Sequence, residues 1–346
     1  MTLRVGIVGA GAAGVGAAYA LRNADAEVTI VEKSRGVCGR AATRRKHDCY
    51  YDHGANYIKE SDQRTESLIR DLGTDGVVDI EKPVWVFDES GEITEGDDGD
   101  SHKWTWTEGI TQLAKRLLAR TDAEVRRETR VESIVCDDSE ATWSLIDTEG
   151  ETHGPFDRLL LTPPAPQTAE ILRATEWDGE RLGDATAAVS DVSYRTIRTF
   201  VLHYPFREEY SWYGLVNVDK AHEVGWVSRE ECKDGHVPDG ESLLIAQMSP
   251  EWSAERYDDP LAEAGDDAAA LVAELLDDDR YADPDWVDDQ GWRYALPNDG
   301  VDTDAVRATE DAGLFFAGDW VVGEGRVHHA LWNGHEAAER IVGRAE

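Results

Sequence analysis

The sequence contains few lysines and little positive charge of any kind. Only eight of its 346 residues are lysine, and 35 Lys and Arg stand against 71 Asp and Glu, for a formal net charge of −36. This balance argues against nucleic acid as a partner, because its phosphates would be repelled. The acidic residues are scattered rather than gathered in one tail, which favours a halophile's cytoplasm, where salt screens their repulsion. An ordinary acidic enzyme is the alternative.

Long apolar runs and paired cysteines are also absent. No hydrophobic run approaches the roughly 20 residues that a membrane helix needs. The first apolar run, Leu3–Val8, lacks the charged start and cleavage site of a signal peptide. We therefore expect a cytoplasmic protein with no membrane partner. The four cysteines show no CxxC pair and no ligand spacing, so no metal is expected.

The N-terminal region has the pattern of a βαβ unit. The run Leu3–Val8 predicts a buried parallel strand, and a glycine-rich turn follows it. Val15–Arg22 is rich in alanine and predicts a helix, and Glu27–Val31 predicts a second strand. This order is typical of a Rossmann-type dinucleotide-binding fold.

Gly9, Gly11 and Gly14 form the motif G-x-G-x-x-G within that unit. Such glycines allow a tight turn, close approach of the backbone to a pyrophosphate and tight packing of helix on strand. Glu32 ends the second strand about 20 residues further on, where a carboxylate binds the ribose hydroxyls and repels a 2′-phosphate. The motif thus favours an unphosphorylated dinucleotide over NADP; a glycine-rich turn without a ligand is the alternative.

Two later segments distinguish FAD from NAD. Arg40 follows the ribose acid closely and can neutralise pyrophosphate charge. Asp319, near the C-terminus, can hydrogen-bond a ribityl hydroxyl. The helix expected over Arg326–Val342 can direct its N-terminus at the flavin, where its dipole would stabilise the reduced form. The sequence therefore predicts a flavoprotein.

These segments resemble the glutathione-reductase-type flavoproteins of the amine oxidase superfamily. The resemblance rests on the glycine motif with Glu32, on Gly39-Arg40, on Gly54–Tyr57 and on Gly318-Asp319, with Cys38 replacing a glycine of the usual G-G-R. It implies noncovalent FAD, because the chain has no cysteine near its C-terminal segment. The cofactor contacts that it implies are Gly9, Gly11, Ala12, Ala13, Gly14, Glu32, Lys33, Gly39, Arg40, Ala55, Asn56, Tyr57, Val131, Gly318, Asp319, Arg326 and Val327.

A narrower resemblance is to the renalase-like branch, especially its bacterial members. It is carried by segments spread over nearly the whole chain: Lys33–Gly36, His153–Phe156, Pro164–Gln167, Trp252-Ser253, Trp292–Ala295, Gly318–Trp320, Gly325–Val327 and Gly334–Ala338. It implies oxidation of dihydronicotinamide (NAD(P)H isomer) substrates, with hydride transfer to flavin N5 and reoxidation by O2 to hydrogen peroxide. Arg293 and Tyr294 would orient the substrate. The chain departs from the branch at His328-His329.

Other functions remain open at this point. A flavin amine oxidase or a desaturase of the same superfamily is one alternative, and a non-catalytic flavin- or nucleotide-binding sensor is another. Trp226 and Trp252 are interpreted as core residues. The basic run Arg44–Lys46 would either attract anionic phosphates or be solvated loop charge.

The predicted fold is α/β, with two interleaved domains. A Rossmann-type FAD-binding domain is expected over 1–75, 107–165 and 301–346. A smaller α+β substrate-binding domain, built on a mostly antiparallel sheet, is expected over 76–106 and 166–300. The proline-rich run Pro163–Pro166 is interpreted as a crossing point between them.

Overall fold

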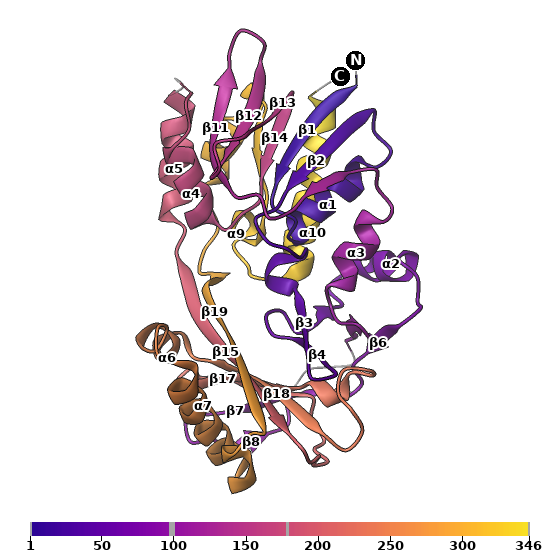
Figure 1. The fold of residues 1–346 in the computed structure, drawn as a ribbon, viewed down its shortest axis with the longest axis vertical. Helices are drawn as coiled ribbons and strands as arrows, with labels where there is room; N and C mark the ends of the chain where they lie inside the picture. Colours follow the sequence, from indigo (N-terminus) through magenta and orange to yellow (C-terminus); the bar gives the residue numbers. More distant parts are fainter. Residues whose placement is uncertain (1, 97–100, 178–179, 345–346) are drawn as a thin grey trace. The chain divides into compact units, whose positions relative to one another are not determined.

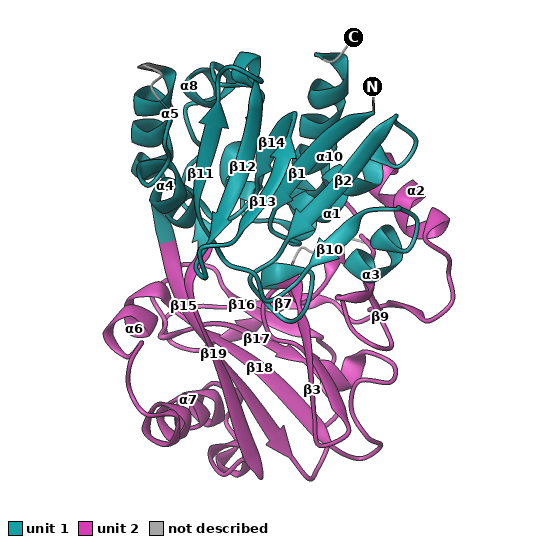
Figure 2. Ribbon diagram, turned by 45° about the horizontal axis from the view of Figure 1, so that its top comes forward, with its two compact units in different colours: residues 1–40, 113–194, 296–346 teal, residues 41–112, 195–295 magenta. Residues whose placement is uncertain are grey.

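The computed structural model describes residues 2–96, 101–177 and 180–344, and the chain divides into two compact units (Figure 2). Unit 1 comprises residues 1–40, 113–194 and 296–346, and unit 2 comprises 41–112 and 195–295. The two units are equally long, so the second is not the smaller domain that the sequence suggested. The expected class is confirmed: a Rossmann-type α/β unit is interleaved with a unit built on a mixed sheet.

The boundaries of the units differ from the expected ones. Residues 41–75 and 107–112 fold with unit 2, whereas 166–194 and 296–300 fold with unit 1. The prolines mark no crossing: Pro164 caps helix α4 (Ala165–Arg173), whose Ala169 and Leu172 are buried in the unit 1 core. Prolines end a strand locally, but the apolar face of the next helix decides which core it joins.

Unit 1 is built on a five-stranded parallel sheet in the order β10-β2-β1-β14-β20. Its strands are β1 (Leu3–Val8), β2 (Ala26–Val31), β10 (Glu124–Arg126), β14 (Arg158–Leu161) and β20 (Leu314–Phe316). Figure 1 shows β14, β1 and β2 side by side. Strands covered on both faces are mostly apolar, which is why the apolar run Leu3–Val8 predicted β1 correctly.

Helices and a second sheet cover opposite faces of this sheet. Ile7 lies against Gly14 of α1 (Ala12–Leu21), while a side chain on Gly6 would collide with Phe156 of β13. Neighbouring residues of a strand point to opposite faces, so α1 and β13 lie on opposite sides. The second sheet is antiparallel and consists of β11 (Val131–Asp137), β12 (Thr142–Asp147) and β13 (Thr152–Phe156).

Helix α10 (Val327–Gly343) packs against α1 at backbone contact distance (Figure 1). A Cβ on Gly334 would lie 1.9 Å from the carbonyl oxygen of Ala13, and one on Gly16 would lie 2.4 Å from that of Leu331. Only glycine permits this approach, which holds the start of α1 against the C-terminal helix. The remaining helices of this unit are α3 (Gln112–Leu118, beginning at the unit boundary), α5 (Glu180–Asp191), α8 (Thr303–Arg307) and α9 (Asp319–Val322).

Unit 2 is built on a seven-stranded sheet in the order β19-β15-β18-β17-β16-β7-β8. Its strands are β7 (Val84–Phe87), β8 (Ile93–Thr94), β15 (Tyr194–Tyr204), β16 (Gly214–Asn217), β17 (Val224–Arg229), β18 (Ser242–Met248) and β19 (Trp286–Pro297). β16 pairs with β7 in parallel, and the other pairings with a described register are antiparallel.

The two faces of this sheet bury different partners. On β15, Phe200 and Leu202 belong to a core shared with α7 (Leu261–Leu276). Val201, between them, belongs to a core with the antiparallel hairpin of β3 (Thr43–Lys46) and β4 (Cys49–Asp52). This alternation is the period of two that a strand imposes.

Shorter elements complete unit 2. They are the sheet of β5 (Ile58–Lys59), β9 (Lys103–Trp106) and β6 (Val77–Asp79), and helices α2 (Gln63–Asp71) and α6 (Pro250–Glu255). The carboxylate of Asp62 caps α2 by accepting the N–H of Thr65. Within the described residues, no helix combines the length and apolarity required for a membrane span.

Candidate functional site

The glycine motif of unit 1 forms an open helix start. Gly9 has φ +99°, and Gly11 is the N-cap of α1, with no side chain capping the helix and no acidic residue in its first turn. A Cβ on Gly11 would meet nothing within 4 Å, whereas one on Gly14 would lie 2.0 Å from the carbonyl oxygen of Gly9. The N–H groups and dipole of this helix start are therefore open to an anion such as a pyrophosphate.

Glu32 is held beside this turn. Its side chain is buried, with Oε2 accepting the N–H of Ala10 at 2.7 Å and Oε1 accepting that of Ser34 at 2.7 Å. A carboxylate has about four acceptor positions, so it retains capacity for the ribose hydroxyls. Lys33 contacts Gln167 through its Nζ at 3.1 Å, and burial lowers the pKa of its ammonium.

The segment after Glu32 returns to the glycine turn. The N–H of Cys38 donates to the carbonyl of Ala10 at 2.8 Å, and Gly39 lies against Gly11. Arg40 then forms an ion pair with Asp319 at 2.8 Å, although 279 residues separate them. Burial alone would lower the pKa of Arg40, but Asp319 outweighs it and the pKa is raised. The two predicted cofactor segments of unit 1 thus meet.

A second open helix start lies at the C-terminal segment. Arg326 is the N-cap of α10, which has no capping side chain and no acidic residue in its first turn. The N–H of Gly318, just before Asp319, donates to Oδ1 of Asn333 on α10 at 3.0 Å. Val327 begins α10, and Val131 lies buried at the start of β11. These residues fit the anionic and hydrogen-bonding parts of FAD.

Three predicted cofactor residues, Ala55, Asn56 and Tyr57, fold with unit 2 rather than with the glycine turn. Side chains donate hydrogen bonds to the backbone carbonyl groups of this segment and of the residues just before it. These hydrogen bonds run from Asn56 Nδ2 to Asp52 O at 2.6 Å, from Trp292 Nε1 to His53 O at 3.2 Å, from Gln247 Nε2 to Gly54 O at 2.7 Å and from Lys233 Nζ to Asn56 O at 2.8 Å.

Behind this segment lies a charged cluster that sequence reasoning missed. Its members are Asp52, Glu230, Lys233 and His236, whose side chains are each 0% exposed. Lys233 Nζ lies 3.0 Å from Asp52 Oδ2 and 2.7 Å from Glu230 Oε1. Burial would raise the pKa of Asp52, but Lys233 and His236 outweigh it and lower the pKa.

His236 contacts the cluster through one ring nitrogen and a backbone carbonyl through the other. His236 Nδ1 lies 2.9 Å from Glu230 Oε2, and its Nε2 lies 2.9 Å from the carbonyl oxygen of Trp106. The sequence offered one local signal, the three-residue spacing of Glu230, Lys233 and His236, and none that linked them to Asp52.

The predicted substrate residues lie on β19 of unit 2. Arg293 is exposed, with its guanidinium 4.5 Å from the ring centroid of Tyr257, and it makes no ion pair with any described residue. Tyr294 is half-buried. Tyr57 lies near Tyr213, with ring centroids 6.0 Å apart, in the same unit.

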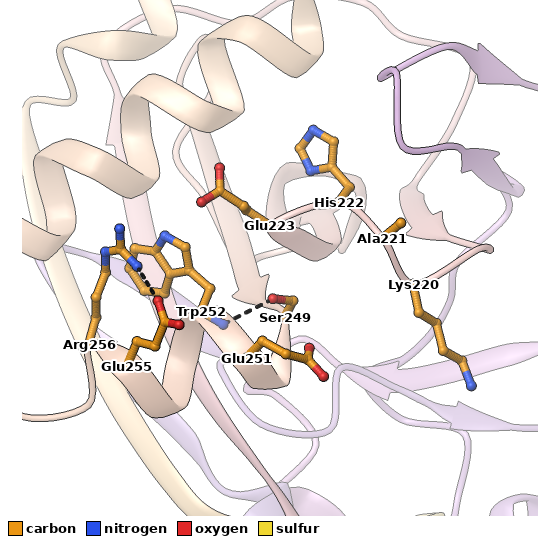
Figure 3. A pocket seen from close by; sticks show the side chains of 9 residues that line it. All are labelled: Lys220, Ala221, His222, Glu223, Ser249, Glu251, Trp252, Glu255 and Arg256. Carbon is orange, nitrogen blue, oxygen red and sulfur yellow. Dashed lines mark hydrogen bonds and ion pairs between the residues drawn. The ribbon is translucent and has the colours of Figure 1, made fainter.

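A surface pocket of unit 2 contains none of the predicted site residues. It lies between the turn Lys220–Glu223 and α6, whose Glu255 pairs with Arg256 (Figure 3). Trp252 lines it from a buried position in the core shared with α7, as expected of a core tryptophan. Arg44 of the basic run pairs with Asp288 at 3.1 Å and is not an isolated charge.

Comparisons with known proteins agree with these features. Residues 7–72 match the family model of NAD(P)-binding Rossmann-like domains, and residues 81–342 match that of flavin containing amine oxidoreductases. A putrescine oxidase in complex with putrescine has a TM-score of 0.76 and 16% identity, with 99% of this chain and 100% of that chain covered. At this identity, the likeness shows the fold alone.

Curated relatives match over short segments. An L-amino-acid oxidase of Crotalus adamanteus is 53% identical over 86 residues, which are 24% of this chain and 17% of that protein. Protoporphyrinogen oxidase 2 of Arabidopsis thaliana is 37% identical over 70 residues, 20% of this chain and 14% of that protein. The chain therefore matches less than a fifth of the length of these relatives.

Proposed function

The chain belongs to the flavin-containing amine oxidoreductase family, and from this premise we propose that it oxidises dihydronicotinamide nucleotides as an FAD-dependent oxidase. The substrate would lose a hydride, and its two electrons would pass to O2 with release of hydrogen peroxide. The family match carries the coarser statement, that the protein is an FAD-dependent oxidoreductase. The choice of substrate is the proposal.

Residues of unit 1 would hold the cofactor. Glu32 would accept the adenosine ribose hydroxyls, and the open start of α1 would bind the pyrophosphate. Arg40 would add positive charge, and Asp319 would accept a hydrogen bond from the ribityl chain. FAD, when bound, supplies the two-electron acceptor.

One observation supports an anionic substrate. Arg293 is an exposed arginine without a carboxylate partner among the described residues, in a chain of net charge −36. The ring of Tyr257 supports its guanidinium, which leaves the planar donors available to a phosphate. Loss of a hydride makes the nicotinamide ring aromatic, so no general base is needed. Arg293 and Tyr294 would act by positioning the substrate.

Anaerobic mixing tests this proposal. The FAD-loaded protein is mixed with 2- and 6-dihydroNAD(P), with L-amino acids and with simple amines, and loss of the flavin absorbance is followed. Fast bleaching by the dihydronicotinamides is expected. Arg293→Gln should raise the KM about tenfold, a loss of about 1.4 kcal/mol, while Arg207→Gln, at an arginine paired with Glu209, should change little. Bleaching by simple amines alone would overturn the proposal.

An L-amino-acid oxidase is the second candidate. The 86-residue match to such an enzyme favours it, and Arg293 is equally suited to an α-carboxylate. The same experiment separates the two, because only this candidate predicts bleaching by L-amino acids with release of ammonia and a 2-oxo acid.

A further inference from the structure

Unit 2 contains a cluster of metal-binding side chains apart from the predicted cofactor residues. Cys49 of β4, His203 of β15 and Glu241, which precedes β18, place their ligand atoms within 4.8 Å of one another. Cys49 is 0% exposed and His203 is 5% exposed, while Glu241 is partly exposed. Three segments distant in sequence thus bring together a thiol, an imidazole and a carboxylate.

The imidazole of His203 is oriented from three sides. Its Nε2 lies 2.9 Å from Glu241 Oε2, and its Nδ1 lies 3.5 Å from Asp285 Oδ2. The ring of Trp286 stacks on it with centroids 5.1 Å apart and an interplanar angle of 9°. Metal-bound histidines commonly direct their second nitrogen at a carboxylate. Asp285 lies on that side of the ring, at ion-pair distance from an Nδ1 that has no hydrogen-bond partner among the described residues.

The charged cluster in the same unit provides a comparison. Asp52, Glu230 and His236 also gather metal-binding atoms, but the ammonium of Lys233 lies against both carboxylates. Around Cys49, by contrast, the charged groups that act on the thiol are carboxylates, and no described lysine or arginine forms an ion pair with Glu241. The cluster around Asp52 therefore contains a lysine, whereas the cluster around Cys49 does not.

We propose that Cys49, His203 and Glu241 bind one Zn²⁺ ion. Thiolate, imidazole and carboxylate are established zinc ligands, and soft sulfur disfavours Mg²⁺ and Ca²⁺. Water fills the fourth position on the partly exposed side of Glu241. The thiol proton passes to solvent when the Zn–S bond forms. Asp285 lies on the Nδ1 side of His203, and the ion ties β4, β15 and the start of β18 together.

Zinc retention by the FAD-loaded full chain tests the proposal. The protein is stripped with a chelator, incubated with ZnCl2 and gel-filtered, and the metal is counted by mass spectrometry. One zinc per chain is expected, with a higher Tm than the stripped protein. Cys49→Ser and Glu241→Gln should each lower the zinc affinity at least tenfold, and Asp285→Asn should lower it ten- to a hundredfold without changing the stoichiometry.

Matched controls separate this site from surface binding. Cys136→Ser, at a cysteine of unit 1, and Glu251→Gln, at a carboxylate of α6, should retain zinc and the Tm increase. Glu241→Gln changes a partly exposed side chain, so it tests the site even where Cys49→Ser fails to fold. Equal zinc binding by wild type and Glu241→Gln, or none by wild type, would overturn the proposal and leave His203 as a hydrogen-bonding partner of Glu241.

Discussion

The two units place charge in opposite ways. In unit 1, helices α1 and α10 begin without a capping side chain or an acidic residue, so their positive ends are open to a ligand. In unit 2, Lys233 and its partners Asp52 and Glu230 are 0% exposed and satisfied by one another. The open helix starts consist of backbone groups, and residues adjacent in the sequence form them. The closed cluster consists of side chains that only the fold brings together. Four predictions test this difference.

The largest effect is expected at Lys233. Lys233→Met leaves Asp52 and Glu230 buried without their ammonium, and removing one partner of a buried ion pair typically costs about 3–5 kcal/mol. Urea unfolding of the FAD-loaded protein measures the loss. Lys115→Met, at an exposed lysine of α3, should change stability by less than about 0.5 kcal/mol. Equal stability of the two variants would show that the cluster is not closed.

His53, next to Asp52, should make stability depend on pH. Its burial, with repulsion by Arg44, lowers its pKa to about 4 from the ordinary 6.5. The unfolded chain then binds a proton at higher pH than the folded one, so stability falls as the pH drops from 6.5 toward 4. At about 1.4 kcal/mol per pH unit, the loss reaches about 3 kcal/mol.

His53→Gln removes the titrating group, so the variant should lose less stability than wild type over this range. Urea unfolding at pH 7, 5.5 and 4 measures the difference between the two proteins. If wild type and His53→Gln lost the same free energy of unfolding between pH 7 and 4, the burial of a neutral His53 would be contradicted.

In unit 1, the contact of α1 with α10 should tolerate no added carbon. Gly334→Ala places a Cβ 1.9 Å from the carbonyl oxygen of Ala13, and such overpacking costs about 1–3 kcal/mol. Gly343→Ala, in the same helix with nothing within 4 Å, should be neutral or slightly stabilising. Thermal unfolding of both variants separates the contact from helix propensity.

The smallest effect is expected at Glu32. Glu32→Gln removes the carboxylate that would accept hydrogen bonds from the ribose hydroxyls. This loss should weaken FAD binding about tenfold, or about 1.4 kcal/mol. Glu27→Gln, at an exposed position of the same strand, is the control and should bind FAD normally. Titration of the apoprotein with FAD, followed by flavin fluorescence, gives both affinities. Unchanged FAD binding by Glu32→Gln would show that the helix start binds the cofactor without help from Glu32.

Much of unit 1 could be predicted from the sequence because its signals are local. The apolar run of β1, the glycine turn and the helix α10 each lie within one short segment. The domain boundaries could not be predicted, since the proline run carries no information about which core buries α4. A halophilic source and a cytoplasmic location stay predictions.

By itself, the sequence determined the strand β1, the glycine turn and the helix α1, with an acid at Glu32 beside them, because turn geometry and strand period depend on neighbouring residues. Only the tertiary structure decided that Arg40 meets Asp319, that Lys233 meets Asp52, and that Cys49 meets His203. Such pairs leave no periodic trace along the chain. Burial in one low-dielectric core makes them strong, and the fold alone brings them to the same place.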